Sequence, residues 1–177
     1  MKTWIIDPDH SVAAFSIRHM MIARVRGQFN KVEGTVRFDP DNISGSSVEL
    51  KIDASSVLSG VRKRDDHLMT ADFLDTAKYP VISFKSSQIK SLAPGRGLVT
   101  GDLTLRGITR SITVEVSYTA PVKDPLGDGL SMGFSMAATL NREDYGITWN
   151  VPMPDVGVML GHEVELLIDL EADLAPD

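Results

Sequence analysis

Histidines and aspartates that lie close together in the sequence are the residues of this chain that could carry chemistry. A histidine beside a carboxylate can act as a general base, and the same pair can bind a metal ion. The chain has no cysteine and no HExxH, GxSxG, P-loop or GxGxxG motif that would supply a nucleophile or a phosphate site. A small hydrolase, an isomerase or a metal-dependent activity that uses such histidine–carboxylate pairs is one interpretation of the function, and it is the alternative to a protein that only binds a ligand. Its candidate residues are His10, His19 and His67, with Asp7, Asp9, Asp65 and Asp66 nearby in the sequence.

The spacing of these side chains does not predict a metal site. No two histidines are separated by two residues within an expected strand or by four residues within an expected helix. If His10, His19 and His67 meet at one end of the fold, a polar collar that binds the headgroup of a ligand becomes as good an interpretation as a metal site. His162 could supply one further donor atom.

Length and composition are those of one ordinary globular domain, which we expect to span residues 1–177. The chain is 42% hydrophobic and 24% charged and has a net charge of −6. Its basic residues are scattered, and the one basic cluster, residues 62–64, is followed by two aspartates. Nucleic-acid binding needs a basic patch, so no nucleic-acid partner is predicted.

No segment approaches the ~20 consecutive apolar residues of a membrane-spanning helix. The N-terminal residues include one lysine but lack the long apolar core and the cleavage site of a signal peptide. We therefore expect a cytoplasmic location, or a periplasmic one if a leader was removed from this sequence.

Apolar and polar residues alternate along most of the chain, which is the pattern of half-buried β-strands. In the first clear example, Phe15 and Ile17 share the face that we expect to be interior. A change of parity in the segment 27–39 predicts a bulge near residues 30–31. The alternating segments are residues 11–19, 27–39, 48–54, 82–86, 99–105, 112–118, 132–140 and 164–170.

This pattern gives about eight to ten antiparallel strands and an all-β fold class. A sheet of that size with one apolar face must either close on itself or pack on a second sheet. The composition alone does not separate a barrel from a sandwich. A barrel of about eight strands has an interior that side chains can fill, or that can hold one small ligand.

Residues 61–87 interrupt the alternation with one or two helical turns followed by a strand. Pro80 is expected to end the helical part. We expect Arg64, Asp65 and His67 to hold this crossover against the rim of the sheet by hydrogen bonds and a shielded ion pair.

Several distinctive motifs follow one another along the chain. They are RDDHL and ADFLDTAKYPVISFKS in the crossover, IDPDHSVAAFSIRH at 6–19, GQF at 27–29, GTVRFD at 34–39, GDLTLRGITR at 101–110 and NREDYGI at 141–147. With these motifs the chain resembles the YceI family of lipocalin-like polyisoprenoid-binding proteins. The resemblance implies an antiparallel barrel of about eight strands with the helical crossover lying across one end. It also implies a polyisoprenoid tail, of a quinone or a polyprenyl lipid, as the ligand.

The interior positions fit a carrier of such an apolar chain, because several of them are small or flexible. These are Ala13, Gly34, Ala54, Gly101, Met132, Met136 and Ala138, and they either leave room for a ligand or pack a tapered core. On the first interpretation the protein binds a lipid without chemistry, and the only cofactor-like molecule is the bound isoprenoid lipid. The predicted ligand-binding residues are Phe15, Ile17, Phe29, Val36, Phe38, Leu50, Ile52, Leu68, Phe73, Ile82, Phe84, Leu103, Leu105, Val114, Met132, Phe134, Met136, Trp149, Met153 and Leu166.

The segment after residue 140 contains a turn and then an apolar loop. In the turn, Gly146 is expected to have positive φ and Arg142 to form salt bridges with the adjacent carboxylates. Residues 148–159 are apolar and rich in proline, Val156 among them, and have no helical period. This loop is either a lid over the barrel or a dimer contact. We favour a homodimer, and transient contact with a membrane surface is a further expectation.

Overall fold

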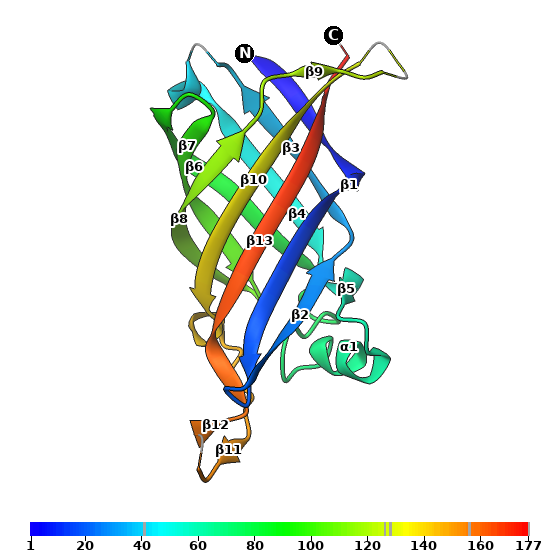
Figure 1. Ribbon diagram of the computed structural model, residues 1–177, viewed down its shortest axis with the longest axis vertical. Coiled ribbons are helices and arrows are strands. Elements are labelled where there is room, and N and C mark those ends of the chain that lie inside the picture. The colour runs from blue at the N-terminus through cyan, green and yellow to red at the C-terminus, as the bar shows by residue number, and fades with distance from the viewer. Residues whose placement is uncertain (41, 126, 128, 156, 177) are drawn as a thin grey trace.

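Eight antiparallel strands close into a barrel in the computed structural model (Figure 1), which describes residues 1–40, 42–125, 127, 129–155 and 157–176. The hydrogen-bonded order is β13-β10-β8-β7-β6-β4-β3-β1, and pairing of β1 with β13 closes it. A barrel rather than a sandwich is thus the solution that this chain adopts. The strands are β1 (Lys2–His19), β3 (Val32–Phe38), β4 (Ser47–Asp53), β6 (Val81–Ala93), β7 (Arg96–Leu105), β8 (Ile108–Tyr118), β10 (Leu130–Asn141) and β13 (Leu160–Leu174).

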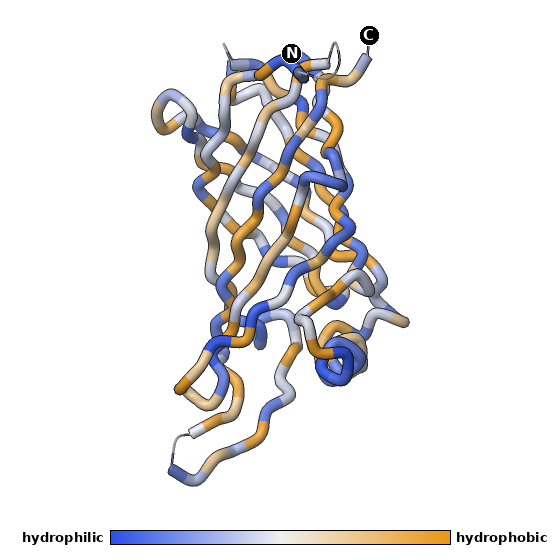
Figure 2. Tube along the Cα trace, turned by 45° about the vertical axis from the view of Figure 1, so that its right-hand side comes forward, coloured by the Kyte–Doolittle hydropathy of each residue, from blue (hydrophilic) through white to orange (hydrophobic). Residues whose placement is uncertain are grey.

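The two-residue alternation decides which side chains point inward. Along β7, Val99 and Leu103 are buried, whereas the hydroxyl of Thr100 contacts that of Thr113 on the exposed face at 2.8 Å. The colours of the barrel strands alternate accordingly between hydrophobic and hydrophilic (Figure 2). Burial of one face of every strand is what stabilises the closed sheet.

The first strand is longer than its alternation predicts, because it contains a bulge. The register of β1 against β13 shifts between Asp7 and Val12. Within the bulge the hydroxyl of Ser11 takes the place of a backbone group: it donates to the Glu171 carbonyl at 3.3 Å and accepts from the Glu171 N–H at 3.1 Å. The residues before the bulge therefore pair with β13 as part of the same strand, although they do not continue the apolar–polar alternation that begins at Ser11.

The prediction of a bulge near residues 30–31 within one long strand is wrong, because the chain divides there into two strands. β2 (Ala23–Phe29) pairs with the second half of β1, and β3 pairs with its first half. Between them, Lys31 N–H donates to the hydroxyl of Ser56 at 3.2 Å. The break lets one continuous segment of chain pair with both halves of β1.

The shorter elements gather mainly at the two ends of the barrel. We call the end near the helix the α1 end and the opposite end, where both chain termini lie, the terminus end (Figure 1). The single α-helix of the described residues has seven residues and lies to the side, next to β5, rather than across the opening. The described helices are all too short to cross a membrane. The short elements are η1 (Ile43–Gly45), η2 (Ala54–Ser56), β5 (Val57–Leu58), α1 (Arg62–Leu68), β9 (Val122–Lys123), η3 (Arg142–Tyr145), β11 (Pro152–Met153) and β12 (Gly157–Val158).

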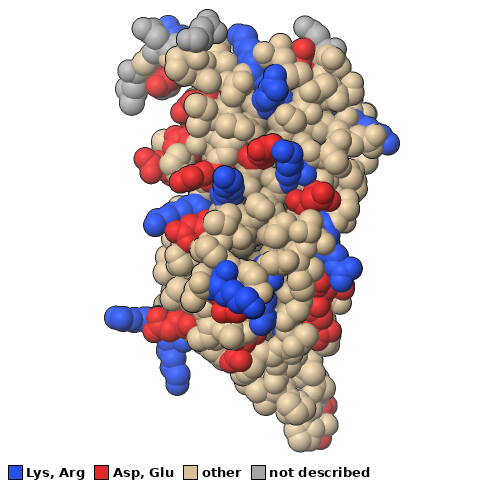
Figure 3. Space-filling model, turned by 180° about the vertical axis from the view of Figure 1, so that it is seen from behind, with Lys and Arg blue, Asp and Glu red and all other residues tan. Residues whose placement is uncertain are grey.

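The outer surface carries charges of both signs. Acidic and basic side chains are interspersed over the face in Figure 3. Some pair across neighbouring strands, as Glu49 and Lys85 do at 2.6 Å. Exposed pairs of this kind contribute little to stability, and they keep the outside of the barrel polar.

Candidate ligand-binding site

A cavity of about 120 Å³ lies inside the barrel. Among the described residues, its wall contains no charged side chain, and the polar side chains in it are those of three serines and a tyrosine. Seven of the eight barrel strands contribute to it, and β1 does not. A cavity of this kind cannot compensate an ion for the loss of its hydration, so it suits an uncharged apolar molecule.

Many of the predicted ligand-binding residues line this cavity, because they belong to the inward-facing sets of their strands. Their role in binding a ligand stays a prediction. They are Val36, Phe38, Leu50, Ile52, Ile82, Phe84, Leu103, Val114, Phe134, Met136 and Leu166.

The other predicted residues lie away from the cavity wall. Phe15 and Phe29 contact each other with ring centroids 5.7 Å apart. Met132 is 2% exposed in the packed core at the terminus end. The remaining members lie toward the α1 end, in its core, helix or loops: Ile17, Leu68, Phe73, Leu105, Trp149 and Met153.

Sequence reasoning missed other residues of the wall. They have the same parity as predicted neighbours, so the alternation itself was the signal that could have found most of them. The exceptions are Ile43 and Ser46, which come from η1 and the residue after it, and Ser83, Ile89 and Ser135, which have the opposite parity. For Ile89 the cause is a register shift of β6 between Ser86 and Gln88. The missed residues are Ile43, Ser46, Val48, Ser83, Ile89, Gly97, Val99, Ile112, Val116, Tyr118, Ser135, Ile168 and Leu170.

The interpretation that small interior residues leave room for a ligand is wrong at most positions. A Cβ atom added at Gly101 would lie 2.5 Å from the ring of Phe84, and one added at Gly34 would lie 2.9 Å from Leu50. A large neighbour therefore fills the space beside each glycine. Of the small or flexible residues considered, only Met136 lines the cavity.

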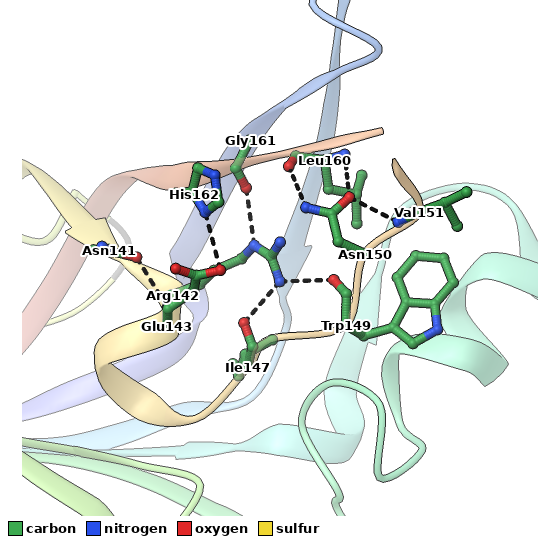
Figure 4. A network of polar contacts seen from close by, with 10 residues as sticks. All are labelled: Asn141, Arg142, Glu143, Ile147, Trp149, Asn150, Val151, Leu160, Gly161 and His162. Atoms are coloured by element: carbon green, nitrogen blue, oxygen red, sulfur yellow. Dashed lines mark hydrogen bonds and ion pairs between the residues drawn. The ribbon is translucent and has the colours of Figure 1, made fainter. Parts of the chain in front are cut away.

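A buried guanidinium organises the loop at the α1 end (Figure 4). Arg142 is 3% exposed, and its Nε donates to the Gly161 carbonyl at 2.9 Å. Its Nη1 donates to the carbonyls of Ile147 at 2.7 Å and Trp149 at 2.9 Å. One side chain thus joins the turn η3, the loop that follows it and the start of β13.

The expectation of a salt bridge from Arg142 to adjacent carboxylates is wrong. Its hydrogen bonds go to backbone carbonyls, and Glu143 instead pairs with His162 at 3.0 Å. Burial lowers the pKa of the Arg142 guanidinium from its ordinary value. The positive φ of Gly146, +71°, is confirmed.

Asn150 continues this network. Its side-chain N–H₂ donates to the Leu160 carbonyl at 2.8 Å, and its oxygen accepts from the backbone N–H groups of Leu160 at 2.9 Å and Val151 at 3.0 Å. The amide side chain imitates a strand partner for the first residue of β13. Hairpin β11–β12 then projects from the α1 end instead of folding across it (Figure 1). Val156, part of the expected lid or dimer contact, lies outside the described residues.

The histidines do not meet at one end of the barrel. The ring of His10 contacts the Asp7 carboxylate at 2.6 Å, and that of His67 contacts Asp72 at 2.8 Å. The hydrogen bond with Asp7 raises the pKa of His10 above its ordinary value, and it lowers the pKa of Asp7. Within the described ranges, the one group of three possible metal-binding side chains is Asp7, His10 and Glu171, which contains a single histidine.

His67 instead belongs to an aromatic cluster. Its ring lies edge-to-face with Phe73 at 4.9 Å and with Trp149 at 5.0 Å between centroids. The cluster therefore attaches the loop after η3 to the segment after α1.

Arg64 and Asp65 form hydrogen bonds in the crossover, as predicted, but both bind Ser59 and do not form the predicted ion pair with each other. Arg64 donates from Nε to the hydroxyl of Ser59 at 2.6 Å and from Nη2 to its carbonyl at 2.7 Å. Buried Asp65 accepts from the backbone N–H of Ser59 at 2.8 Å. Both side chains thus converge on the residue that follows β5.

A closed eight-stranded barrel with a hydrophobic internal cavity is the class of protein that this fold and site define. Residues 4–172 match the model of the YceI-like domain, and the chain belongs to that family. A UPF0312 protein of Vibrio cholerae is 36% identical over 138 residues, which cover 78% of this chain and 72% of the relative. A UPF0312 protein of Staphylococcus aureus is 32% identical over 175 residues, which cover 99% of each.

Solved structures have the same fold at low sequence identity. Burkholderia cenocepacia BcnA superposes with a TM-score of 0.81 and 23% identity, covering 94% of this chain and 98% of that one. A polyisoprenoid-binding domain from Saccharophagus degradans, implicated in plant cell wall breakdown, gives a TM-score of 0.73 and 16% identity, covering 99% and 100%.

Proposed function

We propose that this protein binds and carries a lipid with an apolar chain, a polyisoprenoid or a polyisoprenoid quinone, inside its barrel, and does not alter it chemically. The observation that carries the proposal is the internal cavity with no charged side chain in its wall. Membership of the YceI-like family and the likeness to a polyisoprenoid-binding domain support it.

Burial of the chain supplies the binding free energy. Each buried CH₂ group contributes about 0.8 kcal/mol. About ten carbons therefore give roughly 8 kcal/mol before ordering costs, close to micromolar affinity. An apolar tail needs no ion pair to reach this value, and the wall offers none.

The cavity described above is, by itself, too small for a long chain unless its lining side chains move. An apolar protein cavity of about 150 Å³ accommodates benzene, so the 120 Å³ found here has room for about one isoprene unit. Half-buried lining side chains such as Phe134 and Met136 must then change rotamer as a longer chain enters. Methionine is well suited to such adaptation.

Organic extraction of freshly purified protein, followed by mass spectrometry, tests the proposal. We expect one isoprenoid or long-chain species per barrel that is absent from a mock preparation. An empty extract, obtained again after incubation with quinone and polyprenyl lipids, would rule the carrier function out.

The turn between β1 and β2 supports contact with a membrane surface as part of this function. Met20 and Met21 have φ angles of +51° and +60°, a region that such side chains rarely adopt, and Ile22 is 78% exposed. Arg18 and Arg24 pair across the same hairpin and place positive charge beside this apolar tip, although Arg24 is also paired with Glu165 at 2.6 Å. A tip of this composition suits an anionic bilayer surface.

Vesicle co-sedimentation tests this contact. Met20→Asn together with Met21→Gly should reduce binding to vesicles that contain an anionic lipid and should also stabilise the fold, because the new pair prefers positive φ. Val122→Asp, at an equally exposed site of the terminus end, should leave vesicle binding unchanged. Unchanged binding of the turn variant would refute the contact.

The homodimer remains part of the proposal. Val151, 37% exposed beside the projecting hairpin β11–β12, is a side chain that a second copy would cover. Light scattering after size exclusion should give twice the monomer mass of 19.3 kDa. Val151→Asp should then shift the mass to that of the monomer, and a monomeric wild type would refute the dimer.

A further inference from the structure

Tyr145 places a hydroxyl group in the apolar interior without a hydrogen-bonding partner. The residue is 2% exposed, and its oxygen has no hydrogen-bond partner among the described residues. A buried hydroxyl in this state has lost its bonds to water and gained none in return. Such a group calls for a partner that the chain itself does not supply.

The side chain lies at the α1 end of the ligand cavity. It packs in one cluster with Ala54, Ile82 and Leu103. Ile82 and Leu103 also form part of the cavity wall. Tyr145 is therefore connected to the cavity wall through the cluster that it shares with these two residues.

The hydroxyl has no visible role in holding the fold. The turn η3 is fixed by its backbone and by other side chains: Asn141 Oδ1 accepts from the Glu143 N–H at 3.0 Å, and Gly146 ends the turn with positive φ. A phenylalanine ring would fill the same apolar space. Burial raises the pKa of Tyr145 above its ordinary value, so the phenol stays protonated and can donate.

A second unpartnered donor belongs to the same turn. Nη2 of Arg142 is buried and has no partner among the described residues, although the rest of that guanidinium is fully used. Side chains three residues apart in a 3₁₀ turn lie on the same side of it. The guanidinium nitrogen can only donate and the phenol can donate as well as accept, so the partner that suits both groups is an acceptor oxygen.

We propose that the hydroxyl of Tyr145 donates a hydrogen bond to an oxygen at one end of the bound lipid and so orients the lipid with that end toward the α1 end. This inference rests on the proposed carrier function. The ligand class is narrowed to apolar chains that end in a carbonyl, hydroxyl or similar oxygen. A pure hydrocarbon chain would leave the phenol unpaired.

Competition between two lipids of equal chain length tests the inference. Delipidated wild type and Tyr145→Phe are each titrated with a polyprenol and with the hydrocarbon that lacks its oxygen. The wild type should bind the polyprenol about tenfold more tightly than the hydrocarbon, the value of one good buried hydrogen bond. Tyr145→Phe should bind both lipids alike, at the affinity of the hydrocarbon.

Tyr79→Phe is the matched control, because Tyr79 packs against Gly107 in the turn between β7 and β8 and does not belong to the cavity wall. It should keep the wild-type preference, and Tyr145→Phe should melt no lower than the wild type. Preference retained in Tyr145→Phe, or equal binding of both lipids by the wild type, would overturn this inference alone. Failure of the wild type to bind either lipid would overturn the carrier function together with it.

Discussion

The cavity and the Arg142 network are two buried regions of one barrel, stabilised by opposite chemistry. The cavity wall has no charged group and gains its stability from apolar burial. The network buries a guanidinium whose Nε and Nη1 donate to three backbone carbonyls instead of a carboxylate. The first region can exchange one apolar neighbour for another, whereas the second depends on each individual contact. Ligand adaptation is therefore expected in the cavity and rigidity at the α1 end.

Of the substitutions that test this difference between the two regions, replacement of Arg142 should have the largest effect on stability. Arg142→Met keeps an apolar stem but leaves the carbonyls of Ile147, Trp149 and Gly161 without their donor. We expect the free energy of unfolding to fall by about 3 kcal/mol, measured by chemical denaturation. Arg110→Met, which removes one exposed bond of 3.2 Å to the Asp144 carbonyl, is the control and should cost about 0.5 kcal/mol or less. Equal losses would show that burial of the guanidinium does not matter.

A substitution that fills the cavity should affect ligand binding more than the fold. Val114→Phe adds bulk at a wall position of β8, and we expect the affinity for a polyisoprenoid to fall about tenfold or more. Thr113→Phe adds the same ring on the outer face of the same strand and should leave affinity unchanged. Fluorescence titration of delipidated protein measures both. If the two variants bind alike, the lipid does not occupy this cavity.

The aromatic cluster of His67, Phe73 and Trp149 combines properties of the two regions, because it is half exposed and partly polar. His67→Ala removes its ring contacts with Phe73 and Trp149 and its hydrogen bond to Asp72. We expect a loss of about 1 kcal/mol of unfolding free energy and faster amide exchange in the loop after η3. Asp72→Asn preserves the rings and should lose less. A larger loss for Asp72→Asn would show that the ion pair, and not ring packing, holds the loop.

The regular part of the barrel was predictable from sequence for a physical reason. Alternation at Val99 and Leu103 reports which face is buried, and one residue of slip would reverse every side chain. The parity of the strands also brought Phe84 and Val114 to the cavity wall. Closure of the sheet was not encoded locally, and the prediction of a barrel came from the family resemblance.

The α1 end was less predictable, because its contacts join residues with no periodic relation. Arg142 was expected to pair with neighbouring carboxylates, yet its partners are carbonyls as far away in sequence as Gly161. The small residue Gly101 was interpreted either as room for a ligand or as part of a packed core, and cross-strand packing with Phe84 supports the core. In both cases tertiary contacts, and not local pattern, decide the neighbour of a side chain.

The smallest expected effect concerns the pair of His10 and Asp7 in the bulge of β1, because this pair is exposed to solvent. The hydrogen bond between His10 and Asp7 raises the pKa of the imidazole above its ordinary value of about 6.5 and lowers that of the carboxyl below about 3.9. The stability contributed by His10 is complete below its unfolded pKa and is lost as pH rises through the folded one. That of Asp7 is present above its unfolded pKa and is lost as pH falls through the folded one. The pair therefore contributes most between about pH 3.9 and 6.5.

An NMR titration of the His10 ring measures this effect directly. We expect a midpoint above 6.5 in the wild type and a return toward the ordinary value in Asp7→Asn, which keeps the shape of the bulge. Because the imidazole is exposed, salt should reduce the difference between the two proteins. A midpoint that does not respond to Asp7→Asn would mean that the contact is absent in solution. The two experiments can be compared: a small, salt-sensitive shift of the His10 pKa and a large, salt-insensitive loss of unfolding free energy in Arg142→Met. Together they would establish that burial, and not the number of polar contacts, distinguishes the Arg142 network from the exposed pair.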